Sequence, residues 1–399
     1  MATIAYQDRS GVLTRTRMLK MARSAHAYVR GNTAKFYDWL GESTVVRRIP
    51  AGPPIWICGD CHLGNLGPVA DADGAVAIQI RDLDQCVIGN PAHDLIRLAL
   101  SLETAARGSD LPGVTVAHMI EEMVQGYALA LTAPDAEDHE APEPEVVRSV
   151  RRRALGRRWK HLARERIEDV RPSIPLGKKF WALSDEEREA IEDLVREDGV
   201  RKPLLALCAC DADGEIELLD AAYWRKGCSS LGNLRYALLV GLRRKGGKHE
   251  RLALVDIKEA VAAVAPAAAD AAMPDDHAER VVAGARALAP YLGERMIAAR
   301  LLGRPVVLRE LMPQDLKLEI DQFSRAEAVR AAHFLTYVVG LGHGRQMAPD
   351  ARRAWREELT RRPDGALDAP SWLWEAVVSL AASHEAGYLE HCRRYALET

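Results

Sequence analysis

Residues 57–67 of the chain, ICGDCHLGNLG, carry an Asp, a His and an Asn directly after the apolar run IWI. Polar side chains at this density beside an expected strand are typical of a metal site, a turn that carries a nucleophile, or a phosphoryl-transfer loop. Asp60 and Asn65 are five positions apart, the spacing of the D-x-x-x-x-N loop of kinases. In that loop the Asp takes the proton of the acceptor hydroxyl and the Asn holds magnesium. The stretch therefore raises the hypothesis of phosphoryl transfer.

A second group of acids follows one strand later. The segment AVAIQI, residues 75–80, alternates and is rich in Val and Ile, which predicts a strand. Asp82 and Asp84 come directly after it, and carboxylate oxygens at a strand end suit a magnesium ion that bridges two phosphates. Asn90 and Pro91 have the types expected at a helix start, so a buried helix is expected over 90–102. The loop, the strand and the acidic turn would act together, with one carboxylate on the acceptor and another on the metal.

The run GDCHLGN…IRDLDQCVIGNPAHDL resembles the aminoglycoside phosphotransferase and choline kinase branch of the protein-kinase-like fold. The pattern of that branch is GDxHxxN, a strand, IDFD or IDWE, and then G-[DN]-P-x-x-DL. The resemblance implies that Asp60 is the catalytic Asp and that Asn65 and Asp82 are metal ligands. It implies further that Asp84 is an accessory acid at the metal and that Asp94 ties the helix start to the catalytic loop.

The nucleotide lobe of such kinases precedes the catalytic loop, and the residues before 57 do not provide one. A candidate lies downstream in WRKGCSSLGNLRYALLVGLRRKGGKHERLALVDIKEA, residues 224–260, which reads as strand, Gly-bounded loop, strand, Gly-Gly turn, strand and lysine. In the nucleotide lobe of a kinase, loop amides cover the phosphates and a strand lysine neutralises them. The phosphate loop would contain Gly227, Ser229, Ser230 and Gly232, and the lysine would be Lys258.

Three further elements would complete this lobe. The helix expected over 275–289 would supply an acid for Lys258, and Glu279 is the candidate. The strand at 304–311 would run into the hinge beside adenine, at Glu310 and Leu311. The helix that ends in GLGHGRQ, residues 340–346, would be the one that normally leads into the catalytic loop. Because these elements follow the catalytic loop in the chain, the two lobes would occur in circularly permuted order.

The whole chain also resembles a bacterial family known as domain of unknown function 2252. Landmarks of that family are matched, in its order, by AHAYVRGN (25–32), GDCHLGNLG, RDLDQ, CSSLGNLRY, DIKEA, ERVVAGAR (279–286) and VLREL (307–311). The family name implies no activity, so the functional expectation comes from the kinase-like motifs. Ser229 departs from the family's loop G-x-G-S-x-G at its middle Gly, and its side chain could crowd a phosphate. Arg30, in the first block, could either reach the site or end a helix.

The expected fold is α+β, a bilobal protein-kinase-like architecture in circularly permuted order, with ATP and magnesium between the lobes. Residues 1–202 would form a helical lobe with the catalytic and metal loops, residues 203–315 a small β-rich nucleotide lobe, and residues 316–399 the helices that complete the helical lobe. Strands are expected in LLALCAC from 203, EIELLDAAYW, LRYALLVGL, RLALVDIK and 304–311, with a hairpin turn at 245–248. Further helices are expected at 10–40, 113–131, 145–168, 184–197, 325–342, 350–361 and 370–396.

The composition is that of an ordinary globular protein, with 48% hydrophobic and 28% charged residues. The formal net charge of −3 gives no general electrostatic reason to expect nucleic acid or an acidic membrane as partner. No apolar stretch reaches the ~18 residues of a membrane span and none at the N-terminus resembles a signal peptide, so we expect a cytoplasmic protein. Seven cysteines, an odd number in a long chain, are expected to be thiols, and Cys58 and Cys61 to be small buried residues beside the loop.

These observations favour an ATP- and magnesium-dependent phosphotransferase that acts on a hydroxyl of an unknown small molecule or protein. Asp60 and Lys258 would be catalytic, together with His62, which we expect to organise the loop more than to serve as a base or metal ligand. Two alternatives keep the same fold: a nucleotide-binding regulatory module without turnover, and a transferase that attaches the nucleotide instead of the phosphate. A third is a metal-dependent phosphohydrolase, in which His62 and His93 would bind metals together with neighbouring acids.

Overall fold

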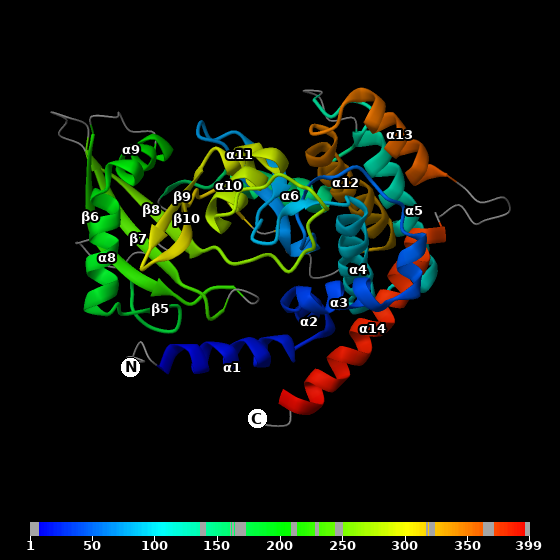
Figure 1. The fold of residues 1–399 in the computed structure, drawn as a ribbon, viewed down its shortest axis with the longest axis horizontal. Coiled ribbons are helices and arrows are strands. Elements are labelled where there is room, and N and C mark those ends of the chain that lie inside the picture. Colours follow the sequence, from blue (N-terminus) through cyan, green and yellow to red (C-terminus); the bar gives the residue numbers. More distant parts are fainter. Residues whose placement is uncertain are drawn as a thin grey trace.

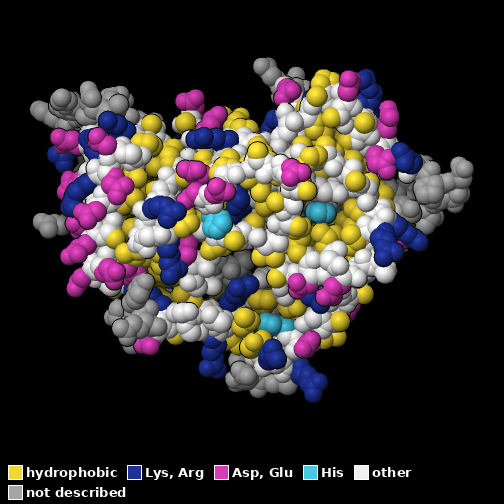
Figure 2. Space-filling view, in the orientation of Figure 1, with side chains coloured by type: hydrophobic (Ala, Val, Ile, Leu, Met, Phe, Trp, Pro, Cys, Tyr) yellow, Lys and Arg dark blue, Asp and Glu magenta, His cyan; other side chains and the backbone are white. Residues whose placement is uncertain are grey.

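The structure of the protein is a computed structural model that describes residues 8–135, 141–159, 161, 163, 173–208, 214–227, 231–243, 250–316, 318, 324–361 and 371–395. A sheet with two covering helices lies at one end of the molecule, and a larger group of helices forms the other end (Figure 1). Acidic and basic side chains are mixed over the face seen in Figure 2, and neither sign covers it alone. Within the described residues, no helix combines the length and the apolar character that a membrane span needs.

The large sheet has six antiparallel strands in the order β5-β6-β7-β8-β10-β9. Their bounds are β5 Phe180–Trp181, β6 Glu215–Trp224, β7 Arg235–Arg243, β8 Glu250–Glu259, β9 Met296–Leu301 and β10 Arg304–Glu310. Alternate residues of β7, from Tyr236 to Leu242, are buried in one cluster with apolar residues of helices α8 (Asp185–Arg196) and α9 (Asp198–Leu207). Because side chains alternate along a strand, Lys258 lies on the opposite face of the sheet from this cluster.

Two short antiparallel ladders hold the loops that carry the candidate acids. Strand β1 (Ile55–Ile57) pairs with β4 (Val87–Gly89), and β2 (Leu66–Ala70) pairs with β3 (Val76–Ile80). The loop 58–65 therefore connects one strand of the first ladder to one of the second, and residues 81–86 connect the other two strands. The 3-10 helix η3 (Leu63–Asn65) closes the first loop.

The remaining helices, apart from α1, form one buried core with these ladders, whereas Leu13 of α1 is buried in the cluster of the large sheet. Glycines allow α5 and α12 to approach closely: a Cβ on Gly126 would lie 2.1 Å from the carbonyl oxygen of His333, and one on Gly340 would lie 2.7 Å from Ala130 Cβ. The helices are α1 Arg9–Met21, α2 Ala25–Gly31, α3 Thr33–Glu42, α4 Ala92–Gly108, α5 Gly113–Ala130, α6 Glu145–Leu155, α10 His277–Leu288, α11 Pro290–Gly293, α12 Arg325–Gly344, α13 Pro349–Thr360 and α14 Ser371–Tyr395, with the 3-10 helix η2 Thr44–Arg48.

Helix α1 contacts both parts of the molecule, and Figure 1 shows it running along one edge from the sheet toward α14. At its start, Arg9 forms a buried ion pair with Glu187 of α8 at 2.8 Å. At its end, the carbonyl oxygen of Met18 lies 2.8 Å from His391 Nε2 of α14, and that of Ala22 accepts a hydrogen bond from Tyr388. The helix therefore connects the sheet part to the C-terminal helix.

The α+β class with an antiparallel sheet is confirmed, and most expected elements are present close to their expected bounds. The strand expected in LLALCAC is wrong: residues 203–207 are the end of helix α9. The single helical region expected over 10–40 consists of three helices, and the strands β2, β4, β5 and β9 were not expected. The helix expected over 145–168 ends at Leu155 as α6, with much of the remainder outside the described residues, as is the turn at 245–248.

Candidate functional site

A sharp turn after β1 positions Asp60. Gly59 has a φ of +72°, and a Cβ there would lie 2.1 Å from the carbonyl oxygen of Gln85, so both the backbone conformation and the close approach require glycine. The hydroxyl of Tyr37 donates to the Gly59 carbonyl at 2.7 Å. The turn is thereby fixed against the 81–86 loop and against helix α3.

Asp94, at the start of α4, holds the backbone of the turn after β1. Its carboxyl oxygens accept from the amides of Cys58 at 2.7 Å and Gly59 at 2.9 Å, and His343 Nε2 of α12 lies 3.2 Å from Oδ2. The side chain is fully buried. The tie between the helix start and the loop, which the kinase resemblance implied for Asp94, is therefore present.

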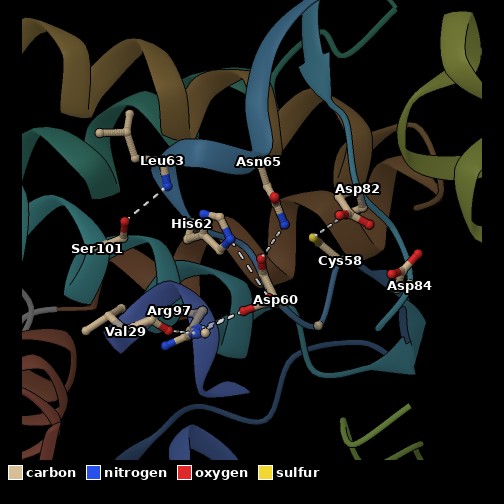
Figure 3. Close-up of polar contacts among 12 residues, drawn as sticks. Val29, Cys58, Asp60, His62, Leu63, Asn65, Asp82, Asp84, Arg97 and Ser101 are labelled. Carbon is tan, nitrogen blue, oxygen red and sulfur yellow. Dashed lines mark hydrogen bonds and ion pairs between the residues drawn. The ribbon is translucent and has the colours of Figure 1, made fainter. Parts of the chain in front are cut away.

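The side chain of Asp60 is buried beside a buried arginine, as Figure 3 shows. Arg97 Nε donates to Asp60 Oδ1 at 3.0 Å, and the same guanidinium donates to the carbonyl oxygen of Val29 at 2.5 Å. Burial raises the pKa of Asp60, and the charge of Arg97 opposes that rise. The side-chain NH₂ group of Asn65 donates to the backbone carbonyl oxygen of Asp60 at 2.9 Å, which closes the loop. The side-chain oxygen of Asn65 is left available to accept a hydrogen bond or bind a cation.

His62 lies on the same loop, with Nε2 3.9 Å from Asp60 Oδ2. Burial, followed by the charges of Arg97 and Arg30, lowers the pKa of His62 well below its usual value, so the imidazole is neutral. The neighbouring amide of Leu63 donates to the Ser101 hydroxyl at 3.1 Å.

Lys258, on β8, meets the acidic turn that follows β3. Its amine lies 3.1 Å from Asp82 Oδ1 and also forms an ion pair with Asp84. Burial and the neighbouring Asp82 raise the pKa of Asp84 to about 6. Burial alone would raise the pKa of Asp82, but Lys258 outweighs it and holds that pKa below the usual value. Burial alone would lower the pKa of Lys258, but the two acids outweigh it and raise that pKa, so the lysine is charged.

Two small cavities flank this contact. One is lined mainly by oxygen-bearing side chains, and its lining residues are Thr33, Asp60, Asn65, Asp82, Asp84, Gln85, Asn233 and Val261. Carboxylate and amide oxygens are the ligand types that magnesium prefers, but within the described residues no three His, Cys, Asp or Glu side chains are close enough together to hold a metal ion. The other is lined by Lys258 and further charged side chains, and it has an apolar wall formed by Ala260, Val281, Leu292, Met296 and Val307. Each has a volume of about 50 Å³.

The family described as "Uncharacterized protein conserved in bacteria (DUF2252)" matches residues 9–394. The chain belongs to the DUF2252 family. No curated protein and no solved structure matches it. The family resemblance expected from the sequence is thereby confirmed over nearly the whole chain.

In this DUF2252 protein, only part of the predicted phosphate loop 227–232 lies within the described residues. Gly227 and Gly232 have φ values of +100° and +112°, conformations that favour glycine, while Ser229 and Ser230 lie outside the described residues. The Gly227 carbonyl accepts from Lys20 of α1 at 3.0 Å.

Glu279 is not the partner of Lys258. It is exposed in the first turn of α10, and Asp82 and Asp84 are the acids that pair with Lys258. Arg280 of α10 reaches the acidic turn instead, and it donates to the carbonyl oxygens of Asp84 at 2.9 Å and Val261 at 2.8 Å. Arg280 is next to Glu279 in the ERVVAGAR block. The sequence analysis therefore selected the correct block of α10 but the wrong one of two adjacent residues.

The hinge expected at Glu310 and Leu311 has its backbone groups engaged within the protein. The Glu310 carbonyl accepts from Arg295 at 3.1 Å, and the Leu311 amide donates to the Leu254 carbonyl at 2.8 Å. The Glu310 side chain pairs with Arg251 at 3.2 Å. These groups therefore hold the end of β10 against β8 and Arg295 in this structure.

Sequence reasoning missed a group of charges on the Lys258 face of the sheet. Arg235, opposite Lys258 in the ladder, forms a buried bidentate pair with Asp256 at 2.6 and 3.0 Å, and Arg309 lies 3.8 Å from the same acid. Lys226 lies nearby with its amine 3.9 Å from the centre of the Trp224 ring. Burial, and then the charge of Arg235, lower the pKa of Lys226 well below its usual value. The signal was the alternation in VDIK, which places Asp256 on the same face as Lys258.

Proposed function

We propose that this DUF2252 protein is a phosphotransferase that uses ATP and magnesium to phosphorylate a hydroxyl group. The observation that carries the proposal is the contact between Lys258 and the acids Asp82 and Asp84, which lie 176 and 174 residues earlier in the chain. One sequence block predicted a metal and acceptor site, and a distant block predicted a phosphate-binding lysine. Their meeting in one cleft supports the interpretation of both blocks as halves of one site.

The connection between helix α12 and strand β1 supports a circularly permuted kinase-like arrangement. Gln346, just after α12, accepts from the Trp56 amide at 2.8 Å and donates to the Trp56 carbonyl at 3.0 Å. His343, in the last turn of α12, contacts Asp94 under the catalytic turn. The helix expected to lead into the catalytic loop thus ends beside that loop in space, although it follows the loop in sequence.

The residues of the cleft divide the chemistry between them. Asp60 would accept the proton of the acceptor hydroxyl, because its raised pKa makes it a better proton acceptor than an ordinary carboxylate and Arg97 fixes its orientation. Asn65, Asp82 and Asp84 would hold magnesium, which when bound neutralises charge on the phosphates. Lys258 would exchange its carboxylate partners for phosphate oxygens, and would thereby position the transferred group.

The apolar wall beside Lys258 would receive the base, since apolar side chains line part of the cavity that contains Lys258, whereas the other cavity is lined mainly by polar side chains. Pockets for ligands of this size usually enclose roughly 300–1,000 Å³. The present volume of about 50 Å³ is much smaller, so binding of ATP requires the cleft to widen and Lys258 to release Asp84.

The proposal is tested by thermal unfolding with magnesium-ATP and by transfer of label from ATP. We expect magnesium-ATP to stabilise the wild type, Lys258→Met to lose that stabilisation, and Asp60→Asn to bind ATP but lose transfer. Lys202→Met, which removes an exposed lysine from α9, is the matched control and should behave as wild type. Absence of any stabilisation of the wild type by magnesium-ATP would contradict the proposal.

The same assay separates the two alternatives that share this fold. Transfer of label from the α-phosphate instead of the γ-phosphate would identify a nucleotidyl transferase. Stabilisation by ATP without hydrolysis or transfer, across a pool of hydroxyl compounds and proteins, would identify a regulatory nucleotide-binding module.

A further inference from the structure

Helix α2 places an arginine directly against the catalytic loop. A Cβ built on Gly64 would lie 2.9 Å from Arg30 Nε, 3.0 Å from Cζ and 3.1 Å from Nη2, so the guanidinium group packs on the backbone of this residue. Gly64 follows Asp60 by four positions and precedes Asn65. A side chain at position 64 would therefore require the guanidinium group to shift.

Arg30 has no hydrogen-bond or ion-pair partner within the part of the chain that the structure describes. Its Nε is buried and unpartnered, while the side chain as a whole is partly exposed. Arg97, whose charge also acts on His62, is different: it is fully buried, and it is paired with Asp60 and with a carbonyl oxygen. A guanidinium group that is partly withdrawn from water without a counter-charge is unfavourable unless a ligand supplies one.

The other polar groups beside Arg30 do not supply that charge. Burial, followed by the charge of Arg30, lowers the pKa of His26 to about 4, so this imidazole is neutral at physiological pH. His62 is neutral as well. The Nδ1 atoms of both histidines are buried and have no partner in the described structure. This side of the loop therefore presents one positive charge and unfilled hydrogen-bonding positions, next to the predicted proton acceptor Asp60.

We propose that Arg30 binds an oxyanion, a phosphate or carboxylate group, of the molecule whose hydroxyl is phosphorylated. The assignment of this anion to the acceptor rests on the proposed phosphotransferase function, whereas the anion site itself does not. Arg30 is then a specificity-determining residue: its planar group can donate two parallel hydrogen bonds to an oxyanion. The acceptor belongs to the class of anionic hydroxy compounds, because a neutral or cationic acceptor would leave the arginine unpaired.

The test measures binding of inorganic phosphate without nucleotide or magnesium, by isothermal titration calorimetry at constant ionic strength in chloride. We expect Arg30→Gln to raise the Kd for phosphate about tenfold or more, the usual consequence of losing charge-assisted hydrogen bonds. Arg23→Gln removes an exposed arginine from the turn before α2 and is the matched control, because it changes the net charge equally. It should leave the Kd unchanged.

Two further variants make the result decisive. Arg30→Lys keeps the charge but not the two parallel hydrogen bonds of a guanidinium group, and should give a smaller increase in Kd. This variant also tests the proposal if Arg30→Gln does not fold. Lys258→Met removes the cation of the nucleotide cleft. Phosphate binding that survives in Arg30→Gln but is lost in Lys258→Met would place the anion in the nucleotide cleft and overturn the proposal. Failure of magnesium-ATP to bind the wild type would contradict the phosphotransferase function and leave the phosphate result to be judged separately.

Discussion

Asp94→Asn should destabilise the protein by about 2–4 kcal/mol, although it changes one atom of a side chain that contacts no solvent. The native side chain accepts from two backbone amides, at 2.7 and 2.9 Å, through different oxygens. Asparagine has one acceptor oxygen, so the amide of either Cys58 or Gly59 would face an NH₂ group. A buried donor left without an acceptor costs about 1–3 kcal/mol, and loss of the charge from the remaining hydrogen bond adds about 1 kcal/mol.

The free energy of unfolding is measured by urea denaturation with tryptophan fluorescence, and the local effect by hydrogen exchange of the amides in residues 55–65. Exchange should accelerate at Cys58 and Gly59 before it accelerates in the sheet. Asp198→Asn is the control: it also removes an acid from the first turn of a helix, but an exposed one that pairs with the exposed Lys202, and should cost no more than about 1 kcal/mol. An Asp94→Asn variant within about 0.5 kcal/mol of wild type, with unchanged exchange in the loop, would refute the role given to this tie.

Gly126→Ala should destabilise the protein by roughly 2–4 kcal/mol, because its Cβ would lie 2.1 Å from the His333 carbonyl oxygen and force α5 and α12 apart. Gly113→Ala, where a Cβ meets nothing within 4 Å, should be neutral or slightly stabilising in the same urea titration. The raised pKa of Asp84, about 6 against 3.8, means that the folded state holds this proton more tightly than the unfolded state. The free energy of unfolding of wild type relative to Asp84→Asn should therefore fall as the pH rises from 4 to 6. The decrease should reach up to about 3 kcal/mol, at about 1.4 kcal/mol per pKa unit. A difference that stays constant over this range would contradict the burial of this acid beside Asp82.

Local pattern was sufficient to predict the acidic loops but not all of their partners. Asp60, Asn65 and Asp82 lie within one continuous block whose strands and turns are set by neighbouring residues, so their mutual placement follows from the chain itself. The meeting of Lys258 with Asp82 could be predicted only because a second motif of matching chemistry occurred downstream.

Partners from different elements were predicted less well, because the sequence alone did not identify which polar residue at a helix start faces inward. On α10, Glu279 and Arg280 differ by about 100° around the helix axis, so an error of one residue exchanges an exposed acid for a buried base. The apolar run after residue 202 shows a related ambiguity: Leu204, Leu205 and Leu207 are buried in a helix that packs on the sheet, and a short apolar run of this kind does not distinguish helix from strand.

The contact that supports the proposed function also holds the cleft closed. Lys258 lies on the sheet, whereas Asp82 and Asp84 belong to the ladders embedded in the helical part, so their ion pairs join the two parts of the molecule. Helix α1 joins them a second time, through Arg9 at the sheet side and through Met18 at α14. A ligand that separates Lys258 from the acids must replace the first set of contacts with its own phosphate and metal interactions. It must also either keep α1 in place, which limits the opening, or break the contacts at one end of α1, either the buried Arg9–Glu187 ion pair at the sheet or the contacts with α14. If the cleft binds nucleotide as proposed, its apparent affinity would be the intrinsic affinity of the open cleft reduced by the free energy of opening, and α1 would contribute to that free energy although it lies outside the cleft.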